Sequence, residues 1–216
     1  MKRMLMLGAA ALSISVYATV GVAACGGTTA NGGSTGGGSA SGTVGGVTLA
    51  VADAVAIAEG GTPGVDARVV LVELLDIPNV CALLQNFPSN ADKGNYTGLG
   101  LQVSVFGVGG AGSVVAGTYT INGGGVGVGD GGIGAASASA TLDRNDAQCT
   151  STVPTADRRA TGGTITISSI SAAGVTGSYS ATFKDGTLSG SFNAAFCSRG
   201  DGGTGSADGG GPRCVQ

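Results

Sequence analysis

Hydrophobic positions in the second half of the chain alternate with small or polar positions, which is typical of strands with one buried face. Leu99, Leu101, Val103 and Val105 follow this period of two, and the pattern recurs three times further along. Those recurrences are Tyr119 and Ile121; Ala136, Ala138, Ala140 and Leu142; and Ile165 and Ile167. Glycine-rich segments separate them, so the sequence predicts an antiparallel β-sandwich or small barrel.

Two stretches nearer the N-terminus are also predicted to be strands. VTLAV at 47–51 is the first, and ARVVLVELL at 67–75 is apolar enough to be buried on both faces. Residues 52–58 are rich in alanine and fit a strand or a helix.

One short helix is predicted within DIPNVCALLQNFP, residues 76–88. Its hydrophobic side chains fall on one helical face, at Val80, Leu83, Leu84 and Phe87. Asp76 and Pro78 suit its first turn, and Pro88 ends it. Cys81 lies beside the hydrophobic face, where it could join the helix to a neighbouring element.

The clearest structural prediction is a hairpin made of two similar segments, VTGSYSATF at 175–183 and LSGSFNAAF at 188–196. Asp185 and Gly186 suit a two-residue turn, which would pair Tyr179 with Phe192. All apolar side chains then share one face. The opposite, solvated face would carry Thr176, Ser178, Ser180, Thr182, Ser189, Ser191 and Asn193.

The first residues have the layout of a signal peptide. Lys2 and Arg3 precede an apolar stretch, and Val22-Ala23-Ala24 provides small residues before Cys25. The segment up to Ala24 is long enough for a transmembrane helix but only weakly hydrophobic. Secretion with simple cleavage after Ala24 is another alternative.

Val22-Ala23-Ala24-Cys25 resembles the lipobox of bacterial lipoproteins, and the resemblance covers the first 25 residues. It implies cleavage after Ala24 and lipid attachment to Cys25, which would anchor the mature chain to a membrane. Gly26 stands where aspartate commonly marks inner-membrane retention, so the resemblance favours the outer membrane. The β-rich remainder is similar to uncharacterised envelope lipoproteins, a likeness that implies no activity.

Composition divides the chain into four parts. A signal peptide at 1–24 precedes the lipidated cysteine and a flexible tether at 25–46, where ten of residues 26–46 are glycine. The antiparallel β-domain is predicted at 47–197, and a glycine-rich tail tied by Cys214 at 198–216.

The cysteines after Cys25 are expected to form two disulfides, because four cysteines in an exported chain are an even set. They are Cys81, Cys149, Cys197 and Cys214. Closing the shortest loops costs the least chain entropy, which favours pairing each cysteine with its nearest neighbour in sequence. Those pairs are Cys81 with Cys149 and Cys197 with Cys214. Native topology can override that preference.

Charge and composition exclude several classes of function. The chain has 10 basic and 13 acidic residues; without Lys2 and Arg3, 8 against 13 leaves a formal charge of −5. That balance argues against nucleic acid binding. The chain has no histidine, which removes Ser-His and Cys-His nucleophilic sites and the usual zinc ligands.

The remaining chemical motifs are weak. Beyond the predicted signal peptide, Lys93 and Lys184 are the only lysines that could form a Ser-Lys pair, and both suit solvated loops. The glycines at 127–132 match G-x-G-x-x-G, but no strand-to-helix context follows them. The sequence predicts no metal ion and no cofactor.

Two carboxylate pairs are left as candidates, Glu73 with Asp76 and Asp143 with Asp146. Asp143 and Asp146 could contribute calcium ligands, although a strand-end turn is the commoner use of such residues. We therefore expect a lipid-anchored envelope lipoprotein with a structural or binding role and no catalysis. Its expected partners are the membrane and an envelope protein or surface ligand, which could meet the polar hairpin face or residues 107–134. The alternative is an exported carboxylate-dependent hydrolase, which requires those four carboxylates to converge.

Overall fold

The computed structural model describes residues 36–85, 95–107, 112–121, 125–127, 134–148 and 150–197. All of them belong to one compact unit, Gly32–Gln216. The predicted signal peptide, the lipobox with Ala24 and Cys25, and the predicted tail lie outside the described residues.

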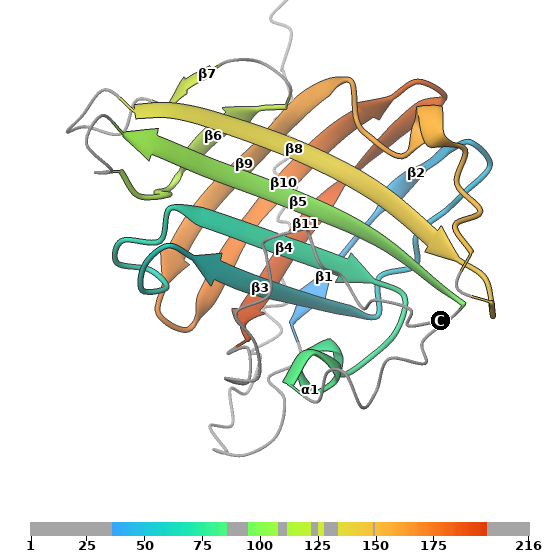
Figure 1. Cartoon of the computed structure of the whole chain (residues 1–216), viewed down its shortest axis with the longest axis horizontal. Coiled ribbons are helices and arrows are strands. Elements are labelled where there is room, and N and C mark those ends of the chain that lie inside the picture. Colours follow the sequence, from blue (N-terminus) through green and yellow to red (C-terminus); the bar gives the residue numbers. More distant parts are fainter. Residues whose placement is uncertain are drawn as a thin grey trace, which may run out of the picture. The chain divides into compact units, whose positions relative to one another are not determined.

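The described residues form one sheet of eleven strands, a short α-helix and a short 3-10 helix (Figure 1). The helices are α1 (Val80–Gln85) and η2 (Thr155–Asp157). The strands are β1 (Gly37–Gly38), β2 (Ser41–Val44), β3 (Asp53–Glu59), β4 (Val69–Leu75), β5 (Tyr96–Gly107), β6 (Gly117–Thr120), β7 (Gly125–Gly127), β8 (Gly134–Asn145), β9 (Gly162–Ser171), β10 (Gly174–Phe183) and β11 (Gly186–Phe196).

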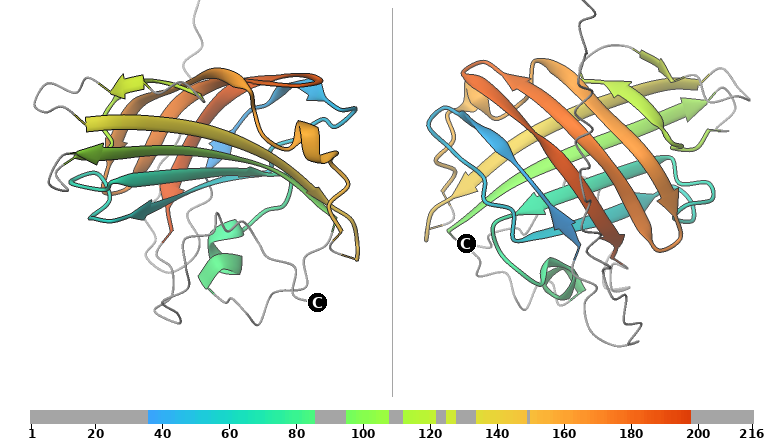
Figure 2. Two further views of the ribbon diagram at one scale, coloured as in Figure 1. Left: turned by 45° about the horizontal axis from the view of Figure 1, so that its top comes forward. Right: turned by 180° about the vertical axis from the view of Figure 1, so that it is seen from behind.

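The sheet follows the order β6-β9-β10-β11-β3-β4-β5-β8-β7, with β1 and β2 also paired to β11. The pairing of β11 with β3 is parallel, whereas the other pairs of described strands are antiparallel. The sheet is therefore mixed. Figure 2 shows β3, β4, β5 and β8 on one side and β9, β10 and β11 on the other.

Short bridging segments nearly close the sheet into a barrel. Ile121, directly after β6, forms a bridge with Ala138 of β8. On the same edge of β8, the Leu142 amide donates to the Arg158 carbonyl at 2.8 Å, and the Ala160 amide donates to the Ala140 carbonyl at 2.9 Å. The predicted fold class, mainly β with one short helix, is confirmed.

Alternation along the strands fills the interior with small and medium side chains. Val72 and Leu74 of β4 and Leu99 and Leu101 of β5 are almost fully buried in the main core. The segment that fits a strand or a helix, 52–58, forms most of β3. The prediction of a strand at 47–51 is wrong, because within that segment only Val47 pairs, in an isolated bridge with Val44.

The hairpin of β10 and β11 is present, but its register is two residues from the predicted one. Phe183 pairs with Gly186, so Lys184 and Asp185 form the turn. Because two residues is one full period of a strand, every apolar side chain keeps its predicted face.

Aromatic rings opposite glycines account for the observed register. Phe192 lies opposite Gly177, and Tyr179 lies opposite Gly190, where the predicted register placed the two rings opposite each other. A ring that covers a glycine fills space that the glycine leaves open. The Tyr179 hydroxyl also donates to the Ser39 carbonyl at 3.1 Å, which ties the hairpin to the N-terminal segment.

The predicted tether ends too late at residue 46, because β1 and β2 belong to the sheet. They pair antiparallel with β11 from Gly37 opposite Asn193 to Val44 opposite Gly186. Val44 is completely buried in the main core. Glycine is needed on this interface: a Cβ on Gly190 would overlap the Ser39 carbonyl oxygen. Part of the glycine content thus permits close strand approach.

The predicted helix is confirmed as α1, with Val80 fully buried. Asp76 and Pro78, predicted in its first turn, precede the helix. Asp53 of β3 accepts a hydrogen bond from the Val80 amide, at 2.8 Å. Pro88 lies outside the described residues.

Replacing Gly177 by alanine should lower the free energy of unfolding by about 1–3 kcal/mol, a typical loss for overpacking. The new Cβ would overlap the Thr166 carbonyl oxygen and lie 2.5 Å from the Phe192 ring. Urea denaturation of both proteins measures the loss. Gly162→Ala on β9 is the matched control, since a Cβ there would have no neighbour within 4 Å. Equal losses in the two variants would contradict this explanation of the register.

Candidate functional site

A second, smaller core holds α1 against the outer face of the sheet. It consists of buried residues from β3, β4, α1, β5 and the end of β11: Val55, Leu75, Val80, Cys81, Tyr96 and Cys197. We call this group the helix core. It lies on the opposite side of β3, β4 and β5 from the main core, because successive side chains of a strand point to opposite faces.

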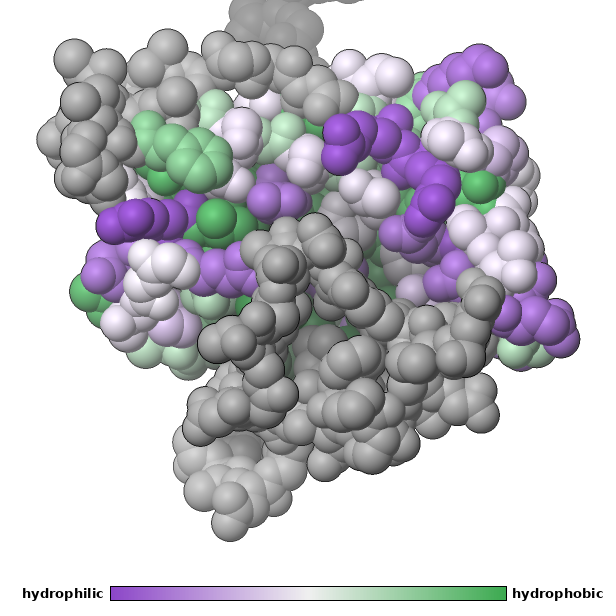
Figure 3. All heavy atoms as spheres, in the orientation of Figure 1, coloured by the Kyte–Doolittle hydropathy of each residue, from purple (hydrophilic) through white to green (hydrophobic). Residues whose placement is uncertain are grey.

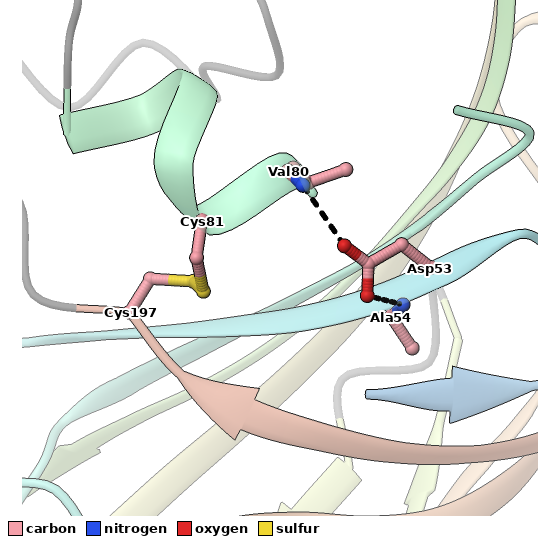
Figure 4. The surroundings of a disulfide bond; sticks show 5 residues. All are labelled: Asp53, Ala54, Val80, Cys81 and Cys197. Carbon is pink, nitrogen blue, oxygen red and sulfur yellow. Dashed lines mark hydrogen bonds between the residues drawn. A yellow bond between two sulfur atoms is a disulfide. The ribbon is translucent and has the colours of Figure 1, made fainter. Parts of the chain in front are cut away.

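A disulfide between Cys81 and Cys197 fastens α1 to the residue that follows β11 (Figure 4). Their Cα atoms are 5.4 Å apart, and 116 positions separate them in sequence. The nearest-neighbour pairing predicted for these cysteines is therefore wrong. Loop entropy favours short loops, but the sheet itself brings the end of β11 beside β3 and α1.

The second predicted disulfide stays a prediction. With Cys81 and Cys197 paired, it would join Cys149 to Cys214. Both of these cysteines lie outside the described residues.

Asp53 organises the start of α1. Its carboxylate accepts hydrogen bonds from the amides of Val80, at 2.8 Å, and Ala54, at 2.9 Å (Figure 4). The side chain is 1 % exposed, so these bonds replace lost water contacts. The role of Asp53 is structural, and the sequence offered no signal for it.

Two of the four candidate carboxylates lie on the same outer face of the sheet. Glu73 is on β4 and Asp143 is on β8, with β5 between them, a separation of about 10 Å between strand axes. On that face β5 presents Gly98, which pairs with Asp143, and Gly100, which pairs with Glu73. The glycines leave space between the carboxylates. A Cβ on Gly100 would lie 3.3 Å from Glu73 Oε1, so the Glu73 carboxylate extends over β5.

Charge and burial differ sharply between these two carboxylates. Asp143 Oδ1 accepts hydrogen bonds from Arg158 Nη2 at 2.5 Å and Nε at 3.1 Å, and both side chains remain partly exposed. Glu73 is 8 % exposed, and no hydrogen bond or ion pair reaches its carboxylate within the described ranges. Burial first, and the charge of Asp143 second, raise the pKa of Glu73 from 4.5 to about 7.

Tyr96 connects this carboxylate pair with the helix core. Burial, followed by the charge of Asp143, raises the pKa of its phenol to about 12, while a hydrogen bond with Asn145 opposes the increase. Tyr96 pairs with Asn145 across β5 and β8 and packs in the helix core. We call Glu73, Tyr96, Asp143, Asn145 and Arg158 the carboxylate cluster.

The other two candidate carboxylates bind backbone amides. Asp76 accepts a hydrogen bond from the Thr97 amide at 2.7 Å. Asp146 accepts from the amides of Gln148 and Thr150, both at 2.9 Å, in the turn after β8. The strand-end turn expected for Asp146 is therefore confirmed, and the four carboxylates do not all converge.

The weaker candidates give no second site. Lys184 lies in the exposed turn of the last hairpin. Lys93 is outside the described residues, as is most of the glycine motif at 127–132. No group of three or more His, Cys, Asp or Glu side chains that could hold a metal ion is found in the described part of the chain.

The polar face predicted for the hairpin extends over neighbouring strands. Cross-strand hydroxyl pairs lie on it, and these pairs are Ser39 with Ser191 at 3.0 Å, Thr118 with Thr166 at 3.1 Å, and Ser169 with Thr176 at 2.7 Å. Strands β1, β2, β6, β9, β10 and β11 contain no charged residue. The face is therefore neutral, and several of its hydroxyls already have protein partners.

Few large hydrophobic side chains are exposed in the described parts of the chain. The exposed ones are Val65, Phe106 and Val115. On the face seen in Figure 3, the hydrophobic areas outside the grey residues are small and interspersed with hydrophilic ones. A wide hydrophobic patch would indicate a binding surface, and this part of the face shows none.

Sequence reasoning missed the roles of Tyr96 and Arg158 in the carboxylate cluster. A signal was present, because Glu73 is the only charged residue within the apolar segment VVLVELL, and Gly98 and Gly100 recur with the period of a strand. Comparison of the chain with protein-family models, curated proteins and solved structures finds no match.

The observed disulfide predicts a definite peptide map. Trypsin places the four cysteines after Cys25 on four peptides, 69–93, 145–158, 185–199 and 214–216. Without reduction, mass spectrometry should find 69–93 joined to 185–199. A link between 69–93 and 145–158 would contradict the structure. Replacing both Cys81 and Cys197 by serine should lower the free energy of unfolding by about 2–5 kcal/mol.

Proposed function

We propose that the chain is a lipoprotein of the bacterial cell envelope, anchored in the outer membrane through lipid on Cys25. Its β-domain has a structural or binding role and no catalytic one. The support from sequence is the charged start, the apolar stretch and the lipobox ending at Cys25. Within the described residues, no helix is both long and apolar enough to cross a membrane.

The observation that carries the proposal is the disulfide between Cys81 and Cys197. Disulfides persist in oxidising compartments and are rare where cellular thiols keep cysteines reduced. A structural disulfide therefore supports export, which the leader also indicates. Export combined with the lipobox supports membrane anchoring over simple secretion.

The arrangement of carboxylates supports a non-catalytic role. Asp76 and Asp146 bind backbone amides, and Glu73 is 8 % exposed. A hydrolase needs its acid and base to reach a substrate in a cleft. The shared face of Glu73 and Asp143 is the observation that favours the alternative, an exported carboxylate-dependent hydrolase. Burial of Glu73 is the argument against it.

Cys25→Ser should abolish membrane association of the protein in a bacterial host that acylates lipoproteins. Without the thiol, no diacylglyceryl group can be attached. Membrane fractionation with intact mass measurement gives the result: the unsubstituted chain should begin at an acylated Cys25.

The double variant Cys81→Ser/Cys197→Ser is the matched control, since it also loses cysteines but keeps the lipobox. It should remain acylated. Equal membrane association of the Cys25→Ser protein would show that the lipobox is not used.

A further inference from the structure

Glu73 is an uncompensated carboxylate in a buried position. Across the outer face, Glu73, Asp143 and Arg158 follow one another from β4 over β5 to β8 and the segment after η2. Arg158 is bonded to Asp143, so its charge compensates that carboxylate. With Glu73 ionised, the three groups carry a net charge of −1. An unpaired charge in a buried site is strongly unfavourable.

No described neighbour supplies the missing charge. From β5, Glu73 faces the phenol of Tyr96 and the two glycines, and from β8 it faces Asp143. Across β3 it pairs with Val55, while Asp53 on that strand binds the amides of α1 and Ala54. The first and last turns of α1 contain no charged residue. One proton on Glu73 would balance the group.

We propose that Glu73 and Asp143 form a proton-operated latch on the outer face of β4, β5 and β8. With a proton on Glu73, its carboxyl group stays packed over Gly100. When both carboxylates are ionised, they repel each other, and Glu73 leaves the face to reach water. This inference concerns a response of the fold and goes beyond the proposed function.

Tyr96 transmits this change to the helix core. The charges of both carboxylates raise the pKa of its phenol, and Tyr96 packs in the same core as Val80 and Cys81. The disulfide and the Asp53 cap keep α1 attached to the sheet. Opening is therefore local, at the start of β5, and the barrel remains folded.

The direction of the response follows from linkage. The pKa of Glu73 is 4.5 unfolded and about 7 folded, so the folded state binds more protons between these values. The contribution of Glu73 to stability is therefore complete below pH 4.5 and is lost as the pH rises to about 7. The chain has no histidine, so no ordinary side-chain titration overlaps the interval from pH 5 to 8.

Urea denaturation of the mature, oxidised protein between pH 5 and 8 tests the latch. Over this range the unfolding equilibrium constant should rise by up to about 70-fold, from the difference between 4.5 and about 7. Glu73→Gln keeps the shape and removes the proton, so its profile should be flat. Asp143→Asn should move the midpoint to lower pH. Asp185→Asn in the hairpin turn is the control and should keep the original profile.

Two measurements on the unsubstituted protein keep the test decisive if a variant fails to fold. Carbon-13 NMR of the Glu73 carboxyl should show titration near pH 7. Amide exchange at residues 98–101, corrected for the intrinsic effect of pH, should accelerate through the same interval. Titration near 4.5, or identical profiles for the original protein and Glu73→Gln, would overturn the proposal.

Discussion

Backbone pairing along both edges of β11 is the constraint on which the rest of the structure depends. One edge of β11 pairs with β10, and the other pairs in succession with β2, β1 and β3. The parallel contact with β3 joins the two sides of the barrel. Glycines make the close approach possible: a Cβ on Gly42 would overlap the Thr187 carbonyl oxygen, and one on Gly186 would overlap that of Thr43. Both glycines have positive φ angles, of 107° and 132°, that other residues rarely adopt.

The alternation of side chains allowed the fold class to be predicted but not the strand register. Moving the last hairpin by two residues leaves every side chain on the same face, so hydrophobic pattern alone cannot distinguish the two registers. The choice depends on the fit of Phe192 over Gly177 and of Tyr179 over Gly190. The same limit explains the tether. Glycine-rich sequence is typical of a linker, and only the partner strand reveals that Gly37–Gly38 and Ser41–Val44 are paired.

The candidate site shows a related limit. Spacing in sequence grouped Glu73 with Asp76 and Asp143 with Asp146, whereas the structure groups Glu73 with Asp143. Asp76 and Asp146 each lie one residue beyond the end of β4 or β8, where their carboxylates accept hydrogen bonds from backbone amides. Convergence came instead from the pairing of β4, β5 and β8, which no local pattern specifies. The disulfide follows the same logic, since the sheet determines which cysteines meet.

Charge is distributed unequally between the two sides of the barrel. Strands β1, β2, β6, β9, β10 and β11 carry none, whereas β3, β4 and β8 carry Asp53, Glu59, Glu73, Asp143 and Arg144. A change of pH within the described strands therefore acts on one side only. That side is also where the helix core and its disulfide lie. The parallel contact between β11 and β3 involves only two residue pairs. A local loosening of β4 and β5 therefore need not disturb the pairing of β9, β10 and β11. A barrel with few large side chains can therefore bury an ionisable group on one side of the sheet and keep its fold through the strand pairing on the other side.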